Sequence, residues 1–196
     1  EDGLMCLWFH NYRMSLRDIR MIVRTFIEVF PNSSLWFAMP ADCFLIGRKN
    51  PSDRPSLAVV NERLARSRGA TFDLSHVHIL KPTALTTCFL LGPEDLRRFS
   101  SGAPMNTDDH PILEFSAPRN LQSDTLASNF AALRAARAED SQPFVDLDPA
   151  LKESAEFHYY NAVALEYKDS VTQAALEARK AHELAPEWEQ ARMLWE

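Results

Sequence analysis

The chain has 196 residues, of which 46% are hydrophobic and 24% charged, so its composition excludes a wholly disordered or fibrous protein. Acidic residues outnumber basic ones 27 to 21 and the formal net charge is -6, which argues against a nucleic-acid partner because phosphate backbones would be repelled. Five glycines form no complete glycine-rich phosphate or dinucleotide loop, and no apolar run approaches the roughly 18 residues that span a bilayer.

The cysteines indicate the cellular compartment, and the first residues indicate whether the sequence is a fragment. Cys6, Cys43 and Cys88 stand apart in apolar contexts, which favours buried free thiols in a reducing compartment. We therefore expect a cytoplasmic location, either for the whole protein or for the cytosolic part of a longer membrane-associated one. Glu1 is followed almost at once by an apolar segment, which indicates a fragment of a longer protein.

The first elements are a strand and a helix. Leu4 to Phe9 is a short apolar run, which is typical of a strand buried on both faces in a parallel sheet. Ser15 and Asp18 form a capping signal for a helix with apolar residues at helical spacing, and Pro31 closes it.

A hairpin follows this helix. Leu35 to Met39 and Cys43 to Gly47 are aromatic and aliphatic runs separated by Pro40-Ala41-Asp42. We expect both runs to lie in one sheet with Leu4 to Phe9, because open α/β sheets commonly finish with an antiparallel pair.

The middle of the chain predicts short covering helices between Pro55 and Phe99, one of them from Pro82 to Leu91. Residues 103–111 are dense in turn formers and predict a polar loop, which leads into an expected strand over Ile112 to Phe115. An alanine-rich helix is expected from Asp124 to Ala138.

The last part of the chain has a helical pattern. Two helices are expected, over Lys152 to Tyr167 and Ser170 to Leu184, with another short one after Pro186. The small and apolar residues have tetratricopeptide-like offsets, and one such pair needs a partner surface to bury its face.

The first 119 residues resemble the C-terminal part of the spermidine/spermine synthase-like family. The resemblance rests on four blocks in order, and the last is the most specific. The blocks are Gly3-Leu4-Met5-Cys6-Leu7-Trp8 with Tyr12, Thr25-Phe26-Ile27-Glu28-Val29-Phe30-Pro31, Leu45-Ile46-Gly47, and Asn106 through Arg119.

The resemblance implies the C-terminal portion of a methyltransferase-like Rossmann sheet, with a tetratricopeptide-like helical tail. The family transfers an aminopropyl group from decarboxylated S-adenosylmethionine to a diamine such as putrescine. Its glycine-rich turn and main catalytic aspartate precede the strand at which this chain begins, so we expect no cofactor within the chain and incomplete catalysis alone. The implied domains are 1–120, a helix and linker at 121–149, and a helical segment at 150–196.

Three aromatic residues are candidates for substrate binding. Trp8, His10 and Tyr12 follow a strand toward the carboxyl edge of the sheet, where open α/β folds bind ligands. The alternative is that Trp8 belongs to the core and Tyr12 packs at the entry of the helix.

Asn106, Asp108 and Asp109 are the second candidate group. Paired carboxylates at a pocket rim would attract a polyamine, whereas the alternative is that these side chains bond backbone amides and build the turn. His76 and His78 are a lone pair of histidines, which is weak evidence for metal ligands, so no metal site is predicted.

Three functions stay open at this point. The first is the transferase fragment, whose partner would be the missing N-terminal half of the same protein. The second is a non-catalytic Rossmann scaffold with a helical-repeat module that binds a protein partner or self-associates. The third is methyl transfer from S-adenosylmethionine, which uses much the same fold.

Overall fold

The computed structural model describes residues 3–50 and 55–196, which form two compact units. The sheet unit contains residues 3–50 and Phe89–Pro143, and the helical unit contains Pro55–Cys88 and Phe144–Glu196. This division differs from the expected sequence boundaries, because Pro55–Cys88 packs with the C-terminal helices. Both units are therefore built from segments that are distant in sequence.

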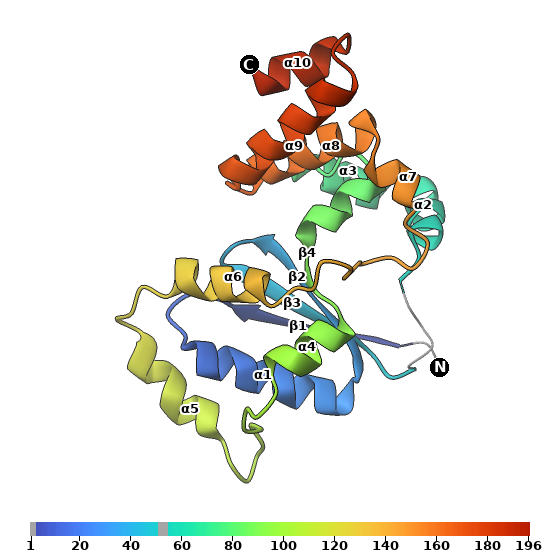
Figure 1. Ribbon diagram of the computed structural model, residues 1–196. Coiled ribbons are helices and arrows are strands. Elements are labelled where there is room, and N and C mark those ends of the chain that lie inside the picture. The colour runs from blue at the N-terminus through green and yellow to red at the C-terminus, as the bar shows by residue number, and fades with distance from the viewer. Residues whose placement is uncertain (1–2, 51–54) are drawn as a thin grey trace. The chain divides into compact units, whose positions relative to one another are not determined.

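The sheet unit has four strands in the order β1-β3-β2-β4, with every neighbouring pair antiparallel (Figure 1). Since β3 is antiparallel to both β1 and β2, these two strands run parallel to each other and are joined by α1. The expected strand, helix and hairpin are confirmed, with β1 beside the hairpin. The bounds are β1 Leu4–His10, α1 Leu16–Val29, β2 Asn32–Met39, β3 Asp42–Arg48, β4 Phe89–Leu91, α4 Pro93–Phe99, α5 Ile112–Ser116, the 3-10 helix η2 Ala117–Asn120, and α6 Leu126–Ala135.

One face of this sheet carries the core. Inward-facing residues of β2 and β3 alternate with outward ones, and α1, α4 and α6 cover the inward face (Figure 1). Gly47 is required there, because a Cβ at this position would lie 2.6 Å from the Cβ of Phe30. The helix α1 can thus approach β3 closely. The fully buried apolar residues include Ile19, Val23, Leu35, Leu45, Leu91, Leu96 and Leu133.

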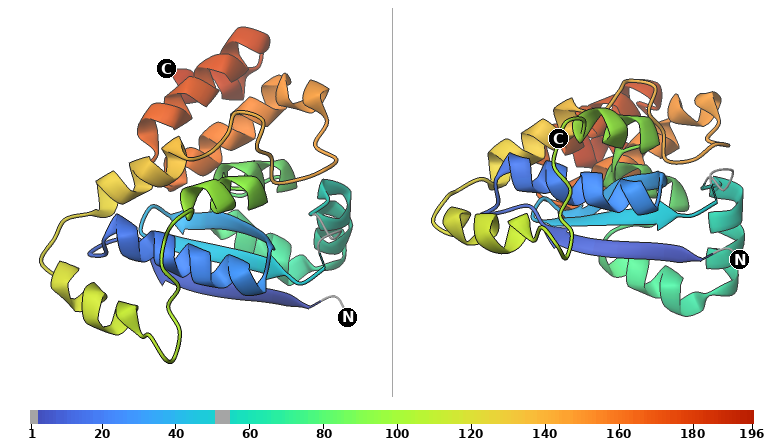
Figure 2. Two further views of the ribbon diagram at one scale, coloured as in Figure 1. Left: turned by 60° about the horizontal axis from the view of Figure 1, so that its bottom comes forward. Right: turned by 90° about the horizontal axis from the view of Figure 1, so that it is seen from below.

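The expectation that Leu4 to Phe9 is buried on both faces is wrong. Strand β1 is the edge of the sheet (Figure 2), and among the described residues it pairs only with β3. Leu4, Cys6 and Trp8 are exposed, so Cys6 is an exposed thiol rather than a buried one. Cys43, on the central strand β3, is buried as expected.

Two further predictions of secondary structure need correction. The segment expected to be helical from Pro82 to Leu91 is a 3-10 helix to Cys88 and then strand β4. The strand expected over Ile112 to Phe115 is helix α5, because the side-chain oxygen of Asn106 accepts a hydrogen bond from the Leu113 amide at 2.9 Å and so stabilises the first turn.

The helical unit contains the predicted antiparallel pair and short third helix. Helix α8 packs against α9, and α10 packs on α9. Small residues are buried along the pair, and Trp188 stacks on Tyr159 with ring centroids 4.6 Å apart. The bounds are α2 Leu57–Arg66, α3 Arg68–His76, the 3-10 helix η1 Pro82–Cys88, α7 Pro149–Lys152, α8 Ala155–Tyr167, α9 Val171–Leu184 and α10 Glu189–Trp195.

Within residues 3–50 and 55–196, no helix combines the length and the apolar character that crossing a membrane requires.

Candidate functional site

Trp8, His10 and Tyr12 form an aromatic ladder at the carboxyl end of β1. The ring centroids of Trp8 and His10 are 6.1 Å apart, and those of His10 and Tyr12 are 4.7 Å apart. Trp8 is 52% exposed and Tyr12 is 41% exposed, so neither is a core residue. Alternate residues of a strand share one face, which explains why the rings of Trp8 and His10 lie next to each other.

Asp42 completes this group, and sequence reasoning did not select it. The indole Nε1 of Trp8 donates a hydrogen bond to Oδ1 of Asp42 at 3.0 Å. Asp42 starts β3 and lies opposite His10 in the antiparallel register. The placement of Asp42 in the turn of the predicted hairpin was the available signal, but the register that brings it to His10 needed the structure.

Hydrogen bonds hold the loop that follows β1, and they fix the position of the aromatic ladder. The buried side chain of Asn129 on α6 donates from Nδ2 to the carbonyl oxygens of Asn11 at 3.0 Å and Met14 at 2.8 Å. Asn11 donates in turn to the Pro40 carbonyl at 3.1 Å, and its amide nitrogen donates to Ala41. The Oδ1 atom of Asn11 is buried without a hydrogen-bond partner. An unpaired hydrogen-bond acceptor thus lies in the loop next to the aromatic ladder.

Asn106, Asp108 and Asp109 lie in a tight turn closed by hydrogen bonds between Thr107 and His110. The backbone N–H of Asn106 donates to the Thr25 hydroxyl at 2.9 Å and ties the turn to α1, while its side-chain oxygen accepts from the Leu113 amide. The side chains of Asp108 and Asp109 are exposed.

The structure does not gather the two predicted groups into one site. The ladder is next to the start of α1, whereas Asn106 contacts Thr25, ten residues beyond Ser15. At 1.5 Å per residue this separates them by roughly 15 Å along the helix. The contact of Asn106 is the one expected if it serves the turn, and any role of Asp108 and Asp109 in binding stays a prediction.

Asp18 is a second residue whose environment the sequence did not reveal. Its carboxylate is 1% exposed and accepts hydrogen bonds from the hydroxyls of Ser15 at 2.7 Å and Ser116 at 2.6 Å. Asn120 adds a longer bond at 3.4 Å. The predicted helix-capping residue therefore also anchors the segment after α5 to the start of α1.

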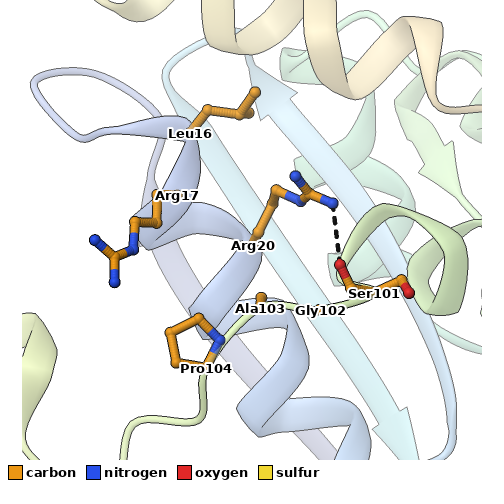
Figure 3. Close-up of a pocket in the computed structure, with 7 residues that line it drawn as sticks. All are labelled: Leu16, Arg17, Arg20, Ser101, Gly102, Ala103 and Pro104. Carbon is orange, nitrogen blue, oxygen red and sulfur yellow. Dashed lines mark hydrogen bonds between the residues drawn. The ribbon is translucent and has the colours of Figure 1, made fainter.

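A hollow of about 290 Å³ lies beside α1 in the sheet unit. Arg17 and Arg20 line it together with the loop Ser101 to Pro104 (Figure 3). Arg20 is committed to that loop, because its guanidinium donates to the carbonyl oxygens of Phe99 and Ser101. Figure 3 shows the side chains of Arg17 and Arg20 extending in opposite directions from α1, so the two guanidinium groups do not converge on one point.

The helical unit contains a separate hollow of about 450 Å³ along α8 and α9. His158 and Glu177 form its polar centre, with 2.7 Å between Nδ1 and Oε2. Lys152 and Lys180 also line it, together with Glu153 and Glu183. Because both lysines and glutamates line this hollow, it has no single sign of charge that would select a ligand.

Lys168 is buried, and its Nζ donates to the Ala164 carbonyl at 3.0 Å and to the Thr87 hydroxyl at 3.2 Å. Burial lowers the pKa of Lys168, although the neighbouring Cys88 opposes this. Burial has the opposite effect on a thiol and raises the pKa of Cys88. Burial also raises the pKa of Cys43 to about 12, and the negative charge of Asp42 adds to that rise. Both thiols are therefore protonated and poor nucleophiles at neutral pH.

No group of three or more His, Cys, Asp or Glu side chains in the described part of the chain is arranged to hold a metal ion. Comparison with protein-family models, with curated proteins and with solved structures finds no match to this chain. The functional argument therefore rests on the ladder and its surroundings.

Proposed function

We propose that this chain is the C-terminal part of a spermidine synthase-like transferase and that its aromatic ladder binds the cationic diamine. The observation that carries the proposal is the row of adjacent rings of Trp8, His10 and Tyr12 beside Asp42. Aromatic faces attract ammonium groups, and a nearby carboxylate adds charge attraction. The position at the carboxyl end of β1 is the usual ligand-binding edge of an open α/β sheet.

The strand arrangement supports the same proposal. Strands β1 and β2 are parallel, α1 connects them, and β3 lies between them. This is the strand, helix and hairpin order that the family resemblance implies for the end of a Rossmann sheet. The tetratricopeptide-like identity of α8 and α9 is likewise a proposal.

The aminopropyl donor would be held outside this chain. Decarboxylated S-adenosylmethionine supplies a sulfonium-activated carbon, which the diamine nitrogen attacks. None of the described glycines forms a glycine-rich turn after a strand, so we assign no residue here to the nucleoside. The partner in this proposal is the missing N-terminal half of the same protein, and the location is cytoplasmic.

The test is a titration of putrescine into the chain, labelled with ¹⁵N at the tryptophan indoles and observed by NMR. We expect the Trp8 indole signal to shift at millimolar putrescine and to shift much less in Asp42→Asn. Asp124→Asn is the matched control, because Asp124 is an exposed carboxylate in the same unit. An unmoved Trp8 signal, or an equal loss in both variants, would contradict the proposal.

Activity gives a second readout. The isolated chain should not turn over putrescine and decarboxylated S-adenosylmethionine, because the nucleoside turn and the catalytic acid lie elsewhere. Turnover by the pure chain would show that this part of the proposal is wrong.

A second candidate is a non-catalytic scaffold whose helical tail binds a protein. The observation that favours it is the exposure of apolar residues on α9 and α10, including Leu184, Met193 and Trp195. This candidate predicts no response of Trp8 to putrescine. Methyl transfer from S-adenosylmethionine would likewise leave the diamine without a specific site.

A further inference from the structure

Cys88 and Lys168 form a pair in the helical unit that the proposed function does not use. Cys88 is the last residue of the 3-10 helix η1, and Lys168 directly follows the end of α8. Lys168 is 2% exposed, and its Nζ donates to the Ala164 carbonyl at 3.0 Å and to the Thr87 hydroxyl at 3.2 Å. An ammonium has three N–H donors, and a hydrogen bond to the sulfur of Cys88 uses the third.

Apolar side chains surround this pair on the side of η1 and α8. Cys88 packs against a cluster formed by Ile79, Ala84 and Ala164, each of which is at most 5% exposed. Cys88 itself is only partly buried. A molecule as small as hydrogen peroxide therefore has access to Cys88, whereas the burial of Lys168 keeps bulky reagents away from its amine.

Each member of the pair changes the ionisation of the other. Burial raises the pKa of the Cys88 thiol, and the charge of Lys168 and its hydrogen bond oppose that rise. Burial lowers the pKa of Lys168, and Cys88 opposes that fall. A larger share of Lys168 is thus an uncharged amine than in an exposed lysine, and the nitrogen of that form is a nucleophile. The thiol reacts slowly at neutral pH, so only sustained exposure to peroxide would oxidise it.

We propose that Cys88 and Lys168 are an oxidation-sensitive modification site, in which hydrogen peroxide oxidises Cys88 and the sulfur then bonds to Nζ of Lys168. In the first step the peroxide O–O bond breaks, the thiol becomes a sulfenic acid, and one water is released. Sulfur is oxidised by two electrons and the peroxide is reduced. In the second step the amine nitrogen attacks sulfur, the S–O bond breaks, and the leaving hydroxide takes a proton from nitrogen to form a second water. Sulfenic acids condense with a backbone nitrogen in the same way.

The S–N bond would join two segments that are distant in sequence. Thr87 and Lys168 are 81 residues apart, and the helical unit is built from Pro55–Cys88 and Phe144–Glu196. A cross-link over a long stretch of chain removes conformational freedom from the unfolded state. We therefore expect oxidation to raise the melting temperature of the helical unit by roughly 5 °C or more. The inference concerns this unit alone and does not depend on diamine binding.

The test is treatment of the chain with hydrogen peroxide at mildly alkaline pH, followed by proteolysis and mass spectrometry. Cys6→Ser removes the exposed thiol and serves as the parent, so that Cys88 and the fully buried Cys43 are the remaining thiols. We expect a Cys88 peptide joined to a Lys168 peptide at a mass two hydrogen atoms below their sum, and release of both peptides by dithiothreitol. Lys168→Met should abolish the joined species, whereas Lys180→Met, at an exposed position of the same unit, should retain it.

Further variants keep the result unambiguous, and circular dichroism checks their folding. Lys168→Arg keeps the charge and should also prevent the bond, because a guanidinium is not deprotonated in proteins. The rise in melting temperature on oxidation should be absent from Lys168→Arg and from Cys88→Ser. Recovery of Cys88 as a thiol, a sulfenic acid or a sulfinic acid beside a free Lys168 would overturn the proposal. A bridge heavier by one oxygen atom would place oxygen between nitrogen and sulfur and would overturn the direct S–N bond.

Discussion

The sheet unit and the helical unit bury different kinds of side chain. Large aliphatic residues such as Ile19, Leu35 and Leu45 fill the core of the sheet unit. The buried contacts of α8 and α9 are made mainly by alanines, including Ala174 and Ala181, and buried polar residues accompany them. Burial of large apolar area stabilises the first unit, whereas the second depends on close approach of helix backbones.

The largest difference should appear when a core leucine is shortened. Leu45→Ala should destabilise the sheet unit by about 2–5 kcal/mol, since Leu45 is fully buried and a cavity would remain. The measurement is amide hydrogen exchange of β2 and β3. Ile46→Ala is the control on the same strand, because Ile46 faces outward and is only half-buried. Equal losses for the two variants would show that the inward face is not the main core.

The sequence was informative where apolar residues follow a clear period. The helix capped by Ser15 and the two strands of the hairpin could be predicted, because helical spacing and short aromatic runs have local causes. The position of β1 at an edge could not, since the neighbours of a strand are set by tertiary pairing. An apolar strand in the centre of a sheet and one at its edge have similar sequences.

The candidate site was predictable only in part. Trp8, His10 and Tyr12 could be selected from the sequence because they follow a strand at alternate positions. Asp42 could not, because its contact with Trp8 spans 34 residues. The turn at residues 106–110 was also predictable, but the start of α5 depends on the hydrogen bond from the Leu113 amide to Asn106.

An intermediate effect is expected from overpacking the helical pair. Ala174→Trp should destabilise the helical unit by roughly 1–3 kcal/mol or more, because a large ring must enter a contact between helices. Thermal melting of the helical circular dichroism measures the effect. Leu176→Trp on the same helix is the control, since Leu176 is 51% exposed. If Ala174→Trp melts like the parent, the assigned packing face of α9 is wrong.

The two units are alike in using one aspartate to join distant segments. In the sheet unit, burial alone would raise the pKa of Asp95, but hydrogen bonds from Ser141, Gly92 and Ala138 lower it below its ordinary value. In the helical unit, Asp146 accepts hydrogen bonds from the Leu57 amide at 2.6 Å, the Ser56 hydroxyl at 2.7 Å and the Ala58 amide at 3.0 Å. Each carboxylate thus holds a late segment against an early one.

The smallest effect should be a dependence on pH that passes through Asp146. Hydrogen bonds from Ala58, Ser56 and Leu57 lower the pKa of Asp146 to about 2, against an ordinary value of 3.8. A carboxylate with a lowered pKa in the folded state contributes stability that is fully present above pH 3.8 and is lost as the pH falls through about 2. Asp146→Asn should remove this contribution, so hydrogen exchange at the start of α2 should become faster at neutral pH and less sensitive to acid.

Asp73→Asn, at an exposed position of the same unit, should leave the acid sensitivity of that helix unchanged. Equal acid sensitivity in Asp146→Asn and the parent would show that the contact between Asp146 and α2 does not stabilise the helical unit.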